Sequence, residues 1–157
     1  MAQNVHATAI VVGSSGLLFI GDSGSGKSER AFACMNEAAS LGHYCALVAD
    51  DQVLVSARGG VVLAEAPRAT AGLLELRGTG IVRLPALGRA VMHVAVLCAR
   101  PGEEPRLPEG SERHSLGPAG ELPLVRLQSG LSVLAAIAAI CPQVPGSKPS
   151  GAASAFG

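Results

Sequence analysis

The chain has 157 residues, of which 48% are hydrophobic and 15% charged, a composition that suits one globular domain with a substantial apolar core. Its formal net charge is zero, so it lacks the broad basic surface with which proteins bind nucleic acid or anionic membranes. Only 3% of the residues are aromatic, which also argues against a base-stacking platform.

The cysteine spacing and the hydropathy pattern indicate in which cellular compartment the protein is expected. The four cysteines lie far apart and have no zinc-ligand spacing, which favours buried thiols in a reducing compartment. The apolar stretch at 131–141 is much shorter than the roughly 20 residues of a membrane-spanning helix, and no basic region precedes a hydrophobic one at the N-terminus. We therefore expect a cytoplasmic protein that binds neither nucleic acid nor membrane.

The first elements predicted along the chain are a hairpin and a helix. Apolar runs at 8–12 and 17–20 flank a Gly-Ser-Ser-Gly turn, which is typical of two buried strands joined by a tight connection. Good helix formers then occupy residues 28–41, and Gly42 stands where a C-terminal cap is expected. A glycine-rich segment separates the second strand from this helix.

Several short strands follow the helix. Residues 45–49 form a buried strand that ends at an acidic corner, a further strand covers 53–55, and a glycine turn leads to another at 61–63. Strands that follow one another without intervening helices predict antiparallel neighbours. The fold class is therefore α/β, with a mixed sheet flanked by helices.

The second half of the chain is predicted in less detail. An apolar segment at 71–76 leads into a glycine-containing stretch, one strand covers 91–99, and residues 100–121 form a long loop. A last buried helix spans 131–140, with Ser129 as its cap. The composition then turns to Pro, Gly, Ser and Ala, so we divide the chain into a folded domain at 1–141 and a disordered tail at 142–157.

The glycine-rich segment carries the strongest functional signal. It fits the phosphate-binding pattern G-x-x-x-x-G-K-[ST] at every fixed position, with the residues Gly21, Asp22, Ser23, Gly24, Ser25, Gly26, Lys27 and Ser28. In such a loop backbone N–H groups surround phosphate oxygens, the lysine reaches the terminal phosphates and the last hydroxyl ligates Mg²⁺. A glycine turn without a ligand is the weaker alternative, because chance seldom places all the fixed residues together.

Composition supports this interpretation. Of the 12 basic residues ten are arginine, and one of the only two lysines is Lys27 of the loop. The chain thus keeps a compact ammonium group where a phosphate needs a point charge. The only three aspartates are Asp22, Asp50 and Asp51, all in or just after the segments assigned to the phosphate site.

Acidic residues after the loop helix suit a metal-dependent phosphoryl transfer. Neighbouring strand residues point to opposite faces, so Asp50 and Asp51 are expected to divide two tasks, one at the nucleophile and one at the metal or a backbone group. A solvated Asp turn is the alternative. Glu75 interrupts an apolar segment, and the pattern fits a site residue and a solvent-facing strand residue equally well. By periodicity alone His6 is an ordinary surface histidine.

Taken together, the ordered segments resemble the catalytic domain of HPr kinase/phosphorylase, the bacterial enzyme that phosphorylates a serine of the phosphocarrier HPr. The resemblance rests on Val5-His6, the phosphate loop with Glu29, Leu47-Val48-Ala49-Asp50-Asp51, and Leu74-Glu75-Leu76-Arg77-Gly78-Thr79-Gly80-Ile81. The last segment selects this family among phosphate-loop proteins. It implies a core similar to those of the HPr kinase catalytic domain and of phosphoenolpyruvate carboxykinase.

The resemblance also implies roles for individual residues. Lys27 and the loop backbone bind the phosphates of ATP, and Ser28 and Glu75 hold Mg²⁺, with Asp51 as a further metal candidate. Asp50 becomes the proton acceptor for the serine hydroxyl, and His6 becomes an active-site residue, which replaces the surface interpretation. Arg106 stands in for the family's loop arginine. The implied partner is an HPr-like protein of the phosphotransferase system.

Departures from the family pattern leave alternatives open. The stretch that reads P-V-R-P-G-R-N in the family corresponds here to Pro123-Leu124-Val125-Arg126-Leu127-Gln128-Ser129-Gly130, which keeps one arginine and loses the other. The kinase direction is therefore predicted, whereas the phosphorylase direction and assembly into a homo-oligomer stay open. A small-molecule kinase and a nucleotide-sensing module without transfer activity are the competing hypotheses. The absence of an N-K-x-D element argues against a GTPase.

Overall fold

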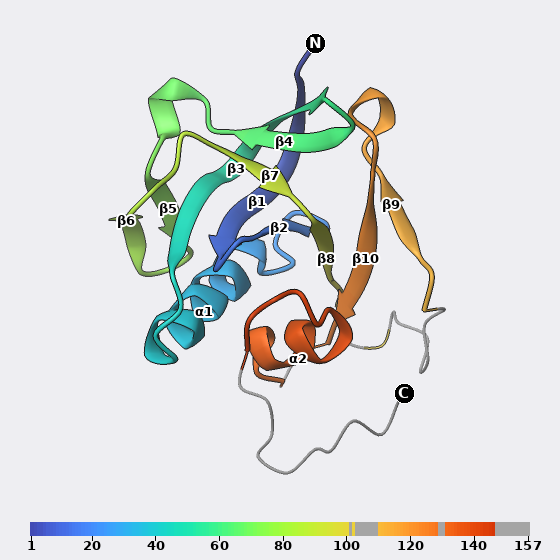
Figure 1. Ribbon diagram of the computed structural model, residues 1–157. Helices are drawn as coiled ribbons and strands as arrows, with labels where there is room; N and C mark the ends of the chain where they lie inside the picture. Colours follow the sequence, from blue (N-terminus) through green and yellow to red (C-terminus); the bar gives the residue numbers. More distant parts are fainter. Residues whose placement is uncertain (101, 103–109, 129–130, 147–157) are drawn as a thin grey trace.

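In this computed structural model, which describes residues 1–100, 102, 110–128 and 131–146, the fold is built on a curled mixed sheet (Figure 1). Eight described strands form it in the order β7-β4-β3-β1-β2-β8-β10-β9, and β5 and β6 form a separate hairpin. The strands are β1 (Gln3–Val12), β2 (Ser15–Ile20), β3 (Cys45–Arg58), β4 (Val61–Glu65), β5 (Leu73–Leu76), β6 (Gly80–Arg83), β7 (Arg89–Met92), β8 (Val94–Cys98), β9 (Arg113–Ser115) and β10 (Glu121–Leu127). The helices are α1 (Lys27–Ser40), α2 (Val133–Ile140) and the 3-10 turns η1 (Arg68–Thr70) and η2 (Gly117–Ala119). The mixed sheet predicted from the sequence is confirmed.

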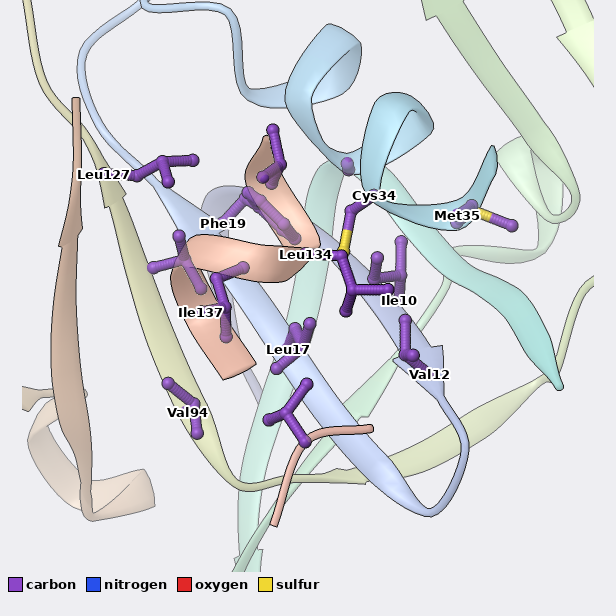
Figure 2. Packing of buried hydrophobic residues seen from close by; sticks show 14 of the residues in the cluster. Ile10, Val12, Leu17, Phe19, Cys34, Met35, Val94, Leu127, Leu134 and Ile137 are labelled. Carbon is purple, nitrogen blue, oxygen red and sulfur yellow. The ribbon is translucent and has the colours of Figure 1, made fainter. Parts of the chain in front are cut away.

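The central strands β1 and β2 are apolar on both faces because both faces of the sheet are covered. Ile10 and Phe19 pack against α1 and α2 on one face (Figure 2). Val11 and Leu18, which alternate with them, face the second core, formed largely by the curled sheet itself. The predicted hairpin is confirmed, since β1 pairs antiparallel with β2.

Helix α1 begins directly after the phosphate loop and packs on the sheet. Its buried residues recur at helical spacing, at Ala31, Cys34, Met35 and Ala38, so one apolar stripe faces the core. The chain leaves the helix through Gly42, whose φ of 77° suits a glycine after a helix end. The predicted helix and its cap are therefore confirmed. In the described part of the chain no helix is long and apolar enough to cross a membrane.

The acidic corner expected after residue 49 is part of one strand, so that prediction is wrong. β3 runs without a break from Cys45 to Arg58 and pairs with β1 along nearly its whole length. The two strands shift register between Ala9 and Ile10, and Asp51 adopts a left-handed φ of 67°. The β1–β3 pairing continues on both sides of this irregularity, so the chain does not leave the sheet at Asp50 and Asp51.

The single strand expected at 91–99 is divided into two, β7 and β8. β7 pairs with β4 at one edge of the sheet, whereas β8 pairs in parallel with β2. At the end of β7 the backbone passes close to Gly16. A Cβ added to Gly16 would lie 1.9 Å from the carbonyl oxygen of Val91, and the N–H of His93, between the two strands, donates to the Gly16 carbonyl oxygen at 2.8 Å. Only a glycine permits this close approach, which periodicity does not reveal.

The C-terminal third contains more structure than predicted. The loop expected at 100–121 includes strand β9 and turn η2 among its described residues. Helix α2 begins at Val133, after Ser132, whereas the predicted cap Ser129 lies outside the described residues. Val144 is buried, so the packed chain continues past residue 142; residues 147–157 of the predicted tail lie outside the described residues.

Candidate active site

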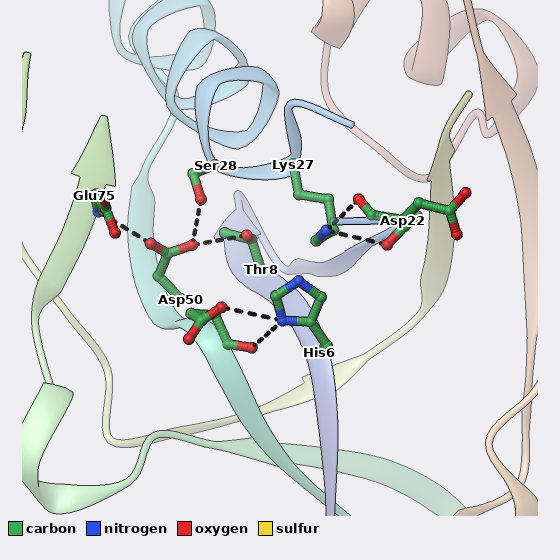
Figure 3. A network of polar contacts seen from close by, with 9 residues as sticks. His6, Thr8, Asp22, Lys27, Ser28, Asp50 and Glu75 are labelled. Atoms are coloured by element: carbon green, nitrogen blue, oxygen red, sulfur yellow. Dashed lines mark hydrogen bonds and ion pairs between the residues drawn. The ribbon is translucent and has the colours of Figure 1, made fainter. Parts of the chain in front are cut away.

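The phosphate loop lies between the end of β2 and the start of α1. Gly21, Gly24 and Gly26 all have positive φ angles, of 144°, 79° and 85°, which residues with a Cβ rarely adopt. Lys27 is only 6% exposed, and its Nζ donates to the carbonyl oxygens of Gly21 and Asp22 at 3.0 and 2.9 Å (Figure 3). The lysine therefore closes back on the loop, where its amine is positioned to meet an anion.

The loop fits a phosphate group on grounds that do not depend on the motif. Helix α1 has Gly26 at its N-cap position and no side-chain cap, which leaves its first N–H groups available to an anion. The Oγ of Ser25 is buried and has no hydrogen-bond partner within the described part of the chain. A buried hydroxyl without a partner costs stability, and a bound phosphate oxygen would supply one.

Asp50 is the centre of a buried hydrogen-bond network. Its Oδ1 accepts the hydroxyls of Thr8 at 2.8 Å and Ser28 at 2.6 Å, and its Oδ2 accepts the backbone N–H of Glu75 at 3.0 Å (Figure 3). The carboxylate is only 6% exposed. It joins β1, α1, β3 and β5, so its first task in this structure is to hold the Ser28 hydroxyl in place.

Asp51 has a different environment and pairs with His6. The Nδ1 of His6 lies 3.0 Å from Asp51 Oδ1 and 3.1 Å from the Asp51 carbonyl oxygen, and both side chains are at least half exposed. Because both neighbours of Nδ1 are acceptors, Nδ1 carries the hydrogen and Nε2 is left open. Sequence alternation placed Asp50 and Asp51 on opposite faces, but the left-handed backbone at Asp51 brings both to one cavity.

One cavity gathers most of the predicted site residues, although Gly21, Asp22 and Ser25 of the loop are not among those that line it. It holds about 170 Å³ and is lined by His6, Thr8, Ser23, Gly24, Gly26, Lys27, Ser28, Glu29, Asp50, Asp51, Glu75 and Arg77. Asp22 contributes its backbone carbonyl, while its carboxylate points away from the acidic residues (Figure 3). Arg106 lies outside the described residues.

No three His, Cys, Asp or Glu side chains in the described ranges gather into a ready-made metal site. The predicted metal residues Ser28, Glu75 and Asp51 nevertheless line one cavity beside the phosphate loop. A magnesium ion that completes its shell with phosphate oxygens and water needs few protein ligands. The residues present therefore fit such an ion only together with a nucleotide.

Two residues make hydrogen bonds that were not predicted from the sequence. Thr8 is fully buried and donates to Asp50, and it stands two residues after His6, so strand alternation could have placed it beside the site. Arg126, the arginine kept from the family stretch, is held in a bidentate pair with Glu112 at 2.7 and 2.8 Å. This hydrogen-bonded pair lowers the pKa of Glu112.

Comparisons with known proteins agree on one family. The family model of the HPr Serine kinase C-terminal domain matches residues 1–91, more than half of the chain. Among curated proteins, HPr kinase/phosphorylase from Mycoplasmopsis pulmonis is 44% identical over 78 residues, which are 50% of this chain and 23% of the relative. The enzyme of the same name from Clostridium novyi is 42% identical over 83 residues, or 53% of this chain and 25% of the relative.

A solved structure extends the likeness in fold. The chain matches the Hpr(Ser) kinase/phosphatase from Coxiella burnetii with a TM-score of 0.71 and 22% identity, over 90% of this chain and 89% of that chain. The alignments with the two curated relatives span about a quarter of their length. The structural match covers 90% of the chain, so the likeness in fold extends beyond residue 91, where the match to the family model ends.

Proposed function

This chain belongs to the HPr serine kinase C-terminal domain family, and we propose that it transfers the terminal phosphoryl group of ATP to a serine of an HPr-like phosphocarrier protein. One observation carries the proposal above all. The phosphate loop, the Ser28–Asp50 hydrogen bond and the His6–Asp51 pair open into the same cavity. Nucleotide, metal and acceptor hydroxyl can therefore meet there.

On the nucleotide side, the loop backbone and Lys27 bind the phosphates. Ser28 and Glu75 would hold Mg²⁺, which when bound supplies positive charge to the phosphoryl oxygens. Asp50 keeps the Ser28 hydroxyl directed into the cavity through its 2.6 Å hydrogen bond. Because this carboxylate is buried and accepts three hydrogen bonds, we assign it a positioning task.

On the acceptor side, we assign proton acceptance to Asp51. Its side chain is 68% exposed, and only one of its carboxylate oxygens has a hydrogen-bonded partner among the described residues. His6 holds that oxygen through Nδ1 and leaves the other free for a serine hydroxyl. A carboxylate cannot deprotonate an alcohol outright, so Asp51 orients the hydroxyl and takes the proton late, as charge moves to the phosphoryl group. This division moves proton acceptance from Asp50, to which the resemblance assigned it, to Asp51, and it leaves Asp50 with the positioning of Ser28.

The surface beside the cavity supports a protein acceptor over a small molecule. Ile81 is 69% exposed and lies directly opposite Glu75 in the β5–β6 hairpin. An exposed branched side chain at the rim of a polar site suits contact with another protein surface. All four cysteines are unpaired, which supports a cytoplasmic, reducing location for this reaction.

A direct assay tests the proposal. The chain is incubated with purified HPr, Mg²⁺ and ATP labelled in the terminal phosphate, with Lys27→Ala as the matched inactive variant. We expect label on one serine of HPr, and none with the variant. Binding of ATP without transfer to HPr would reject the kinase proposal, and transfer to a metabolite in the absence of HPr would favour a small-molecule kinase.

A further inference from the structure

Arg100 lies beside the phosphate loop, on the side away from the two aspartates. β8 runs parallel to β2 with Ile20 opposite Leu97, so both strands end at the same edge of the sheet. Three residues beyond this pair the chains reach Ser23 and Arg100, and Nη2 of Arg100 lies 3.4 Å from the carbonyl oxygen of Ser23. The order β3-β1-β2-β8 places Asp50 and Asp51 on the opposite side of the loop strand.

The end of β8 is in close contact with the loop. A Cβ added to Gly21 would lie 2.7 Å from the carbonyl oxygen of Cys98, so the loop begins directly against this strand. The pairing of β8 with β2 therefore places the backbone of Arg100, two residues after Cys98, beside the loop, whatever contact its side chain makes. In the described ranges Arg100 has no carboxylate partner, and its contact with the Ser23 carbonyl oxygen is the hydrogen bond that it makes there.

The contact with the Ser23 carbonyl has a consequence for the next N–H group. In a trans peptide the C=O and the N–H point in opposite directions. A donor that holds the Ser23 carbonyl from outside the loop therefore turns the Gly24 N–H toward the inside. The φ of 79° at Gly24 belongs to this arrangement, which only glycine adopts readily.

We propose that Arg100 is a positioning residue for the nucleotide, which fixes the Ser23–Gly24 peptide with its N–H directed at a phosphate of ATP or ADP. This inference rests on the proposed nucleotide site but not on the identity of the acceptor. The guanidinium also polarises the peptide that it holds, because hydrogen bonds to a charged donor strengthen the next bond in a chain. Arg100 thereby adds to binding of the nucleotide without touching the acceptor.

The experiment measures the Kd for ADP and the steady-state constants for ATP in Arg100→Ala, Arg100→Gln and Arg100→Lys. Arg58 is exposed at the far end of β3, so Arg58→Ala is the matched control. We expect Arg100→Ala to raise the Kd for ADP and the KM for ATP by about fivefold, since one exposed charge-assisted bond is lost. kcat at saturating ATP should stay within about twofold, because the lost interaction contributes equally to ground and transition states.

The conservative variants separate positioning from a purely structural role. Arg100→Lys keeps a charged donor and should restore most of the affinity, while Arg100→Gln keeps a neutral donor and should fall between Lys and Ala. The melting temperature without nucleotide should match that of Arg58→Ala.

An unchanged Kd for ADP in Arg100→Ala, or a lowered melting temperature without rescue by lysine, would overturn the inference. Normal ADP binding with no phosphoryl transfer by the unsubstituted chain would reject the proposed kinase activity. The Kd for ADP in the Arg100 variants would then still test whether Arg100 positions the nucleotide. Failure of the unsubstituted chain to bind any nucleotide would reject both.

Discussion

Ser28 donates a 2.6 Å hydrogen bond to the same Asp50 oxygen that accepts the Thr8 hydroxyl, so one carboxylate joins the first turn of α1 to strands β1 and β3. The hydroxyl that the loop offers to a metal is therefore held from the sheet side before any nucleotide arrives. Preorganisation of this kind lowers the cost of binding, because the side chain need not be ordered on contact.

Exchange of each aspartate for asparagine separates the two assigned roles. Asp51→Asn should bind ADP as tightly as the unsubstituted chain and lose about 100-fold or more in kcat, because it removes the group that accepts the proton. Asp50→Asn places an amide N–H₂ where a carboxylate accepts hydrogen bonds. It should therefore lower stability by about 1–2 kcal/mol and weaken Mg²⁺-dependent ATP binding. Calorimetry of nucleotide binding and single-turnover transfer report these effects separately.

The opposite pattern has a clear meaning as well. Intact nucleotide affinity with lost transfer in Asp50→Asn, together with near-normal transfer in Asp51→Asn, would return proton acceptance to Asp50. Glu121→Gln is the matched control, since Glu121 is exposed on β10, pairs with Arg113 and is not among the residues that line the cavity, so it should be dispensable for both measurements.

His6 offers a test of which ring nitrogen matters. Asparagine can place its amide N–H near the position of Nδ1, whereas glutamine reaches the position of Nε2. If His6 acts by holding Asp51 through Nδ1, His6→Asn should keep kcat within about fivefold, and His6→Gln should lower it by roughly 10- to 100-fold. The reverse order would show that Nε2 contacts the acceptor or a phosphate, and that the pair with Asp51 is secondary.

How far the sequence predicts this site depends on how local each signal is. The glycines, Lys27 and Ser28 lie within eight consecutive residues, so one local pattern predicts the positive φ angles that the loop glycines adopt, whereas the role of these residues in nucleotide binding stays a prediction. The left-handed backbone at Asp51 has no sequence signature beyond Asp itself, which tolerates that conformation. Strand alternation was therefore the wrong guide at the one position where the roles of the aspartates divide.

Long-range contacts explain the remaining differences. The strand expected at 91–99 is split because the chain crosses Gly16, a residue far away in sequence. Helix α2 lacks a cap from its own side chains because Glu37 of α1 takes that place. Neither partner can be identified from local propensity, since each is supplied by tertiary packing.

Glu37 should therefore matter for stability and not for catalysis. Its carboxylate accepts the Ser132 hydroxyl at 2.5 Å and the backbone N–H groups of Val133 and Leu134 at 3.0 Å each, at the start of α2. Glu37→Ala leaves these donors without partners and should lower the free energy of unfolding by about 1–3 kcal/mol. Urea denaturation measures the loss. Ser132→Ala removes one donor only and should cost less, and an equal or larger cost for Ser132→Ala would contradict this account.

Buried thiols predict how stability changes in alkali. Burial raises the pKa of the Cys34 thiol from 9.0 to about 12, with a further contribution from Glu37. Burial also raises the pKa of Cys98 from 9.0 to about 11, against the opposing charges of Arg30 and Lys27. Between pH 9 and these values the unfolded chain has lost protons that the folded chain keeps, so stability falls as pH rises. The slope should reach at most ~1.4 kcal/mol per pH unit for each thiol.

Replacement of one thiol isolates its share of this slope. Cys34→Ala leaves a small cavity and lowers stability at every pH, but the quantity of interest is the difference between unfolding free energies at pH 8.5 and pH 10.5. That difference should be smaller in Cys34→Ala than in the unsubstituted chain, because the group that ionises only on unfolding has been removed. Equal differences in the two proteins would mean that the folded chain releases the Cys34 proton as readily as the unfolded chain, through local opening of α1 away from the sheet.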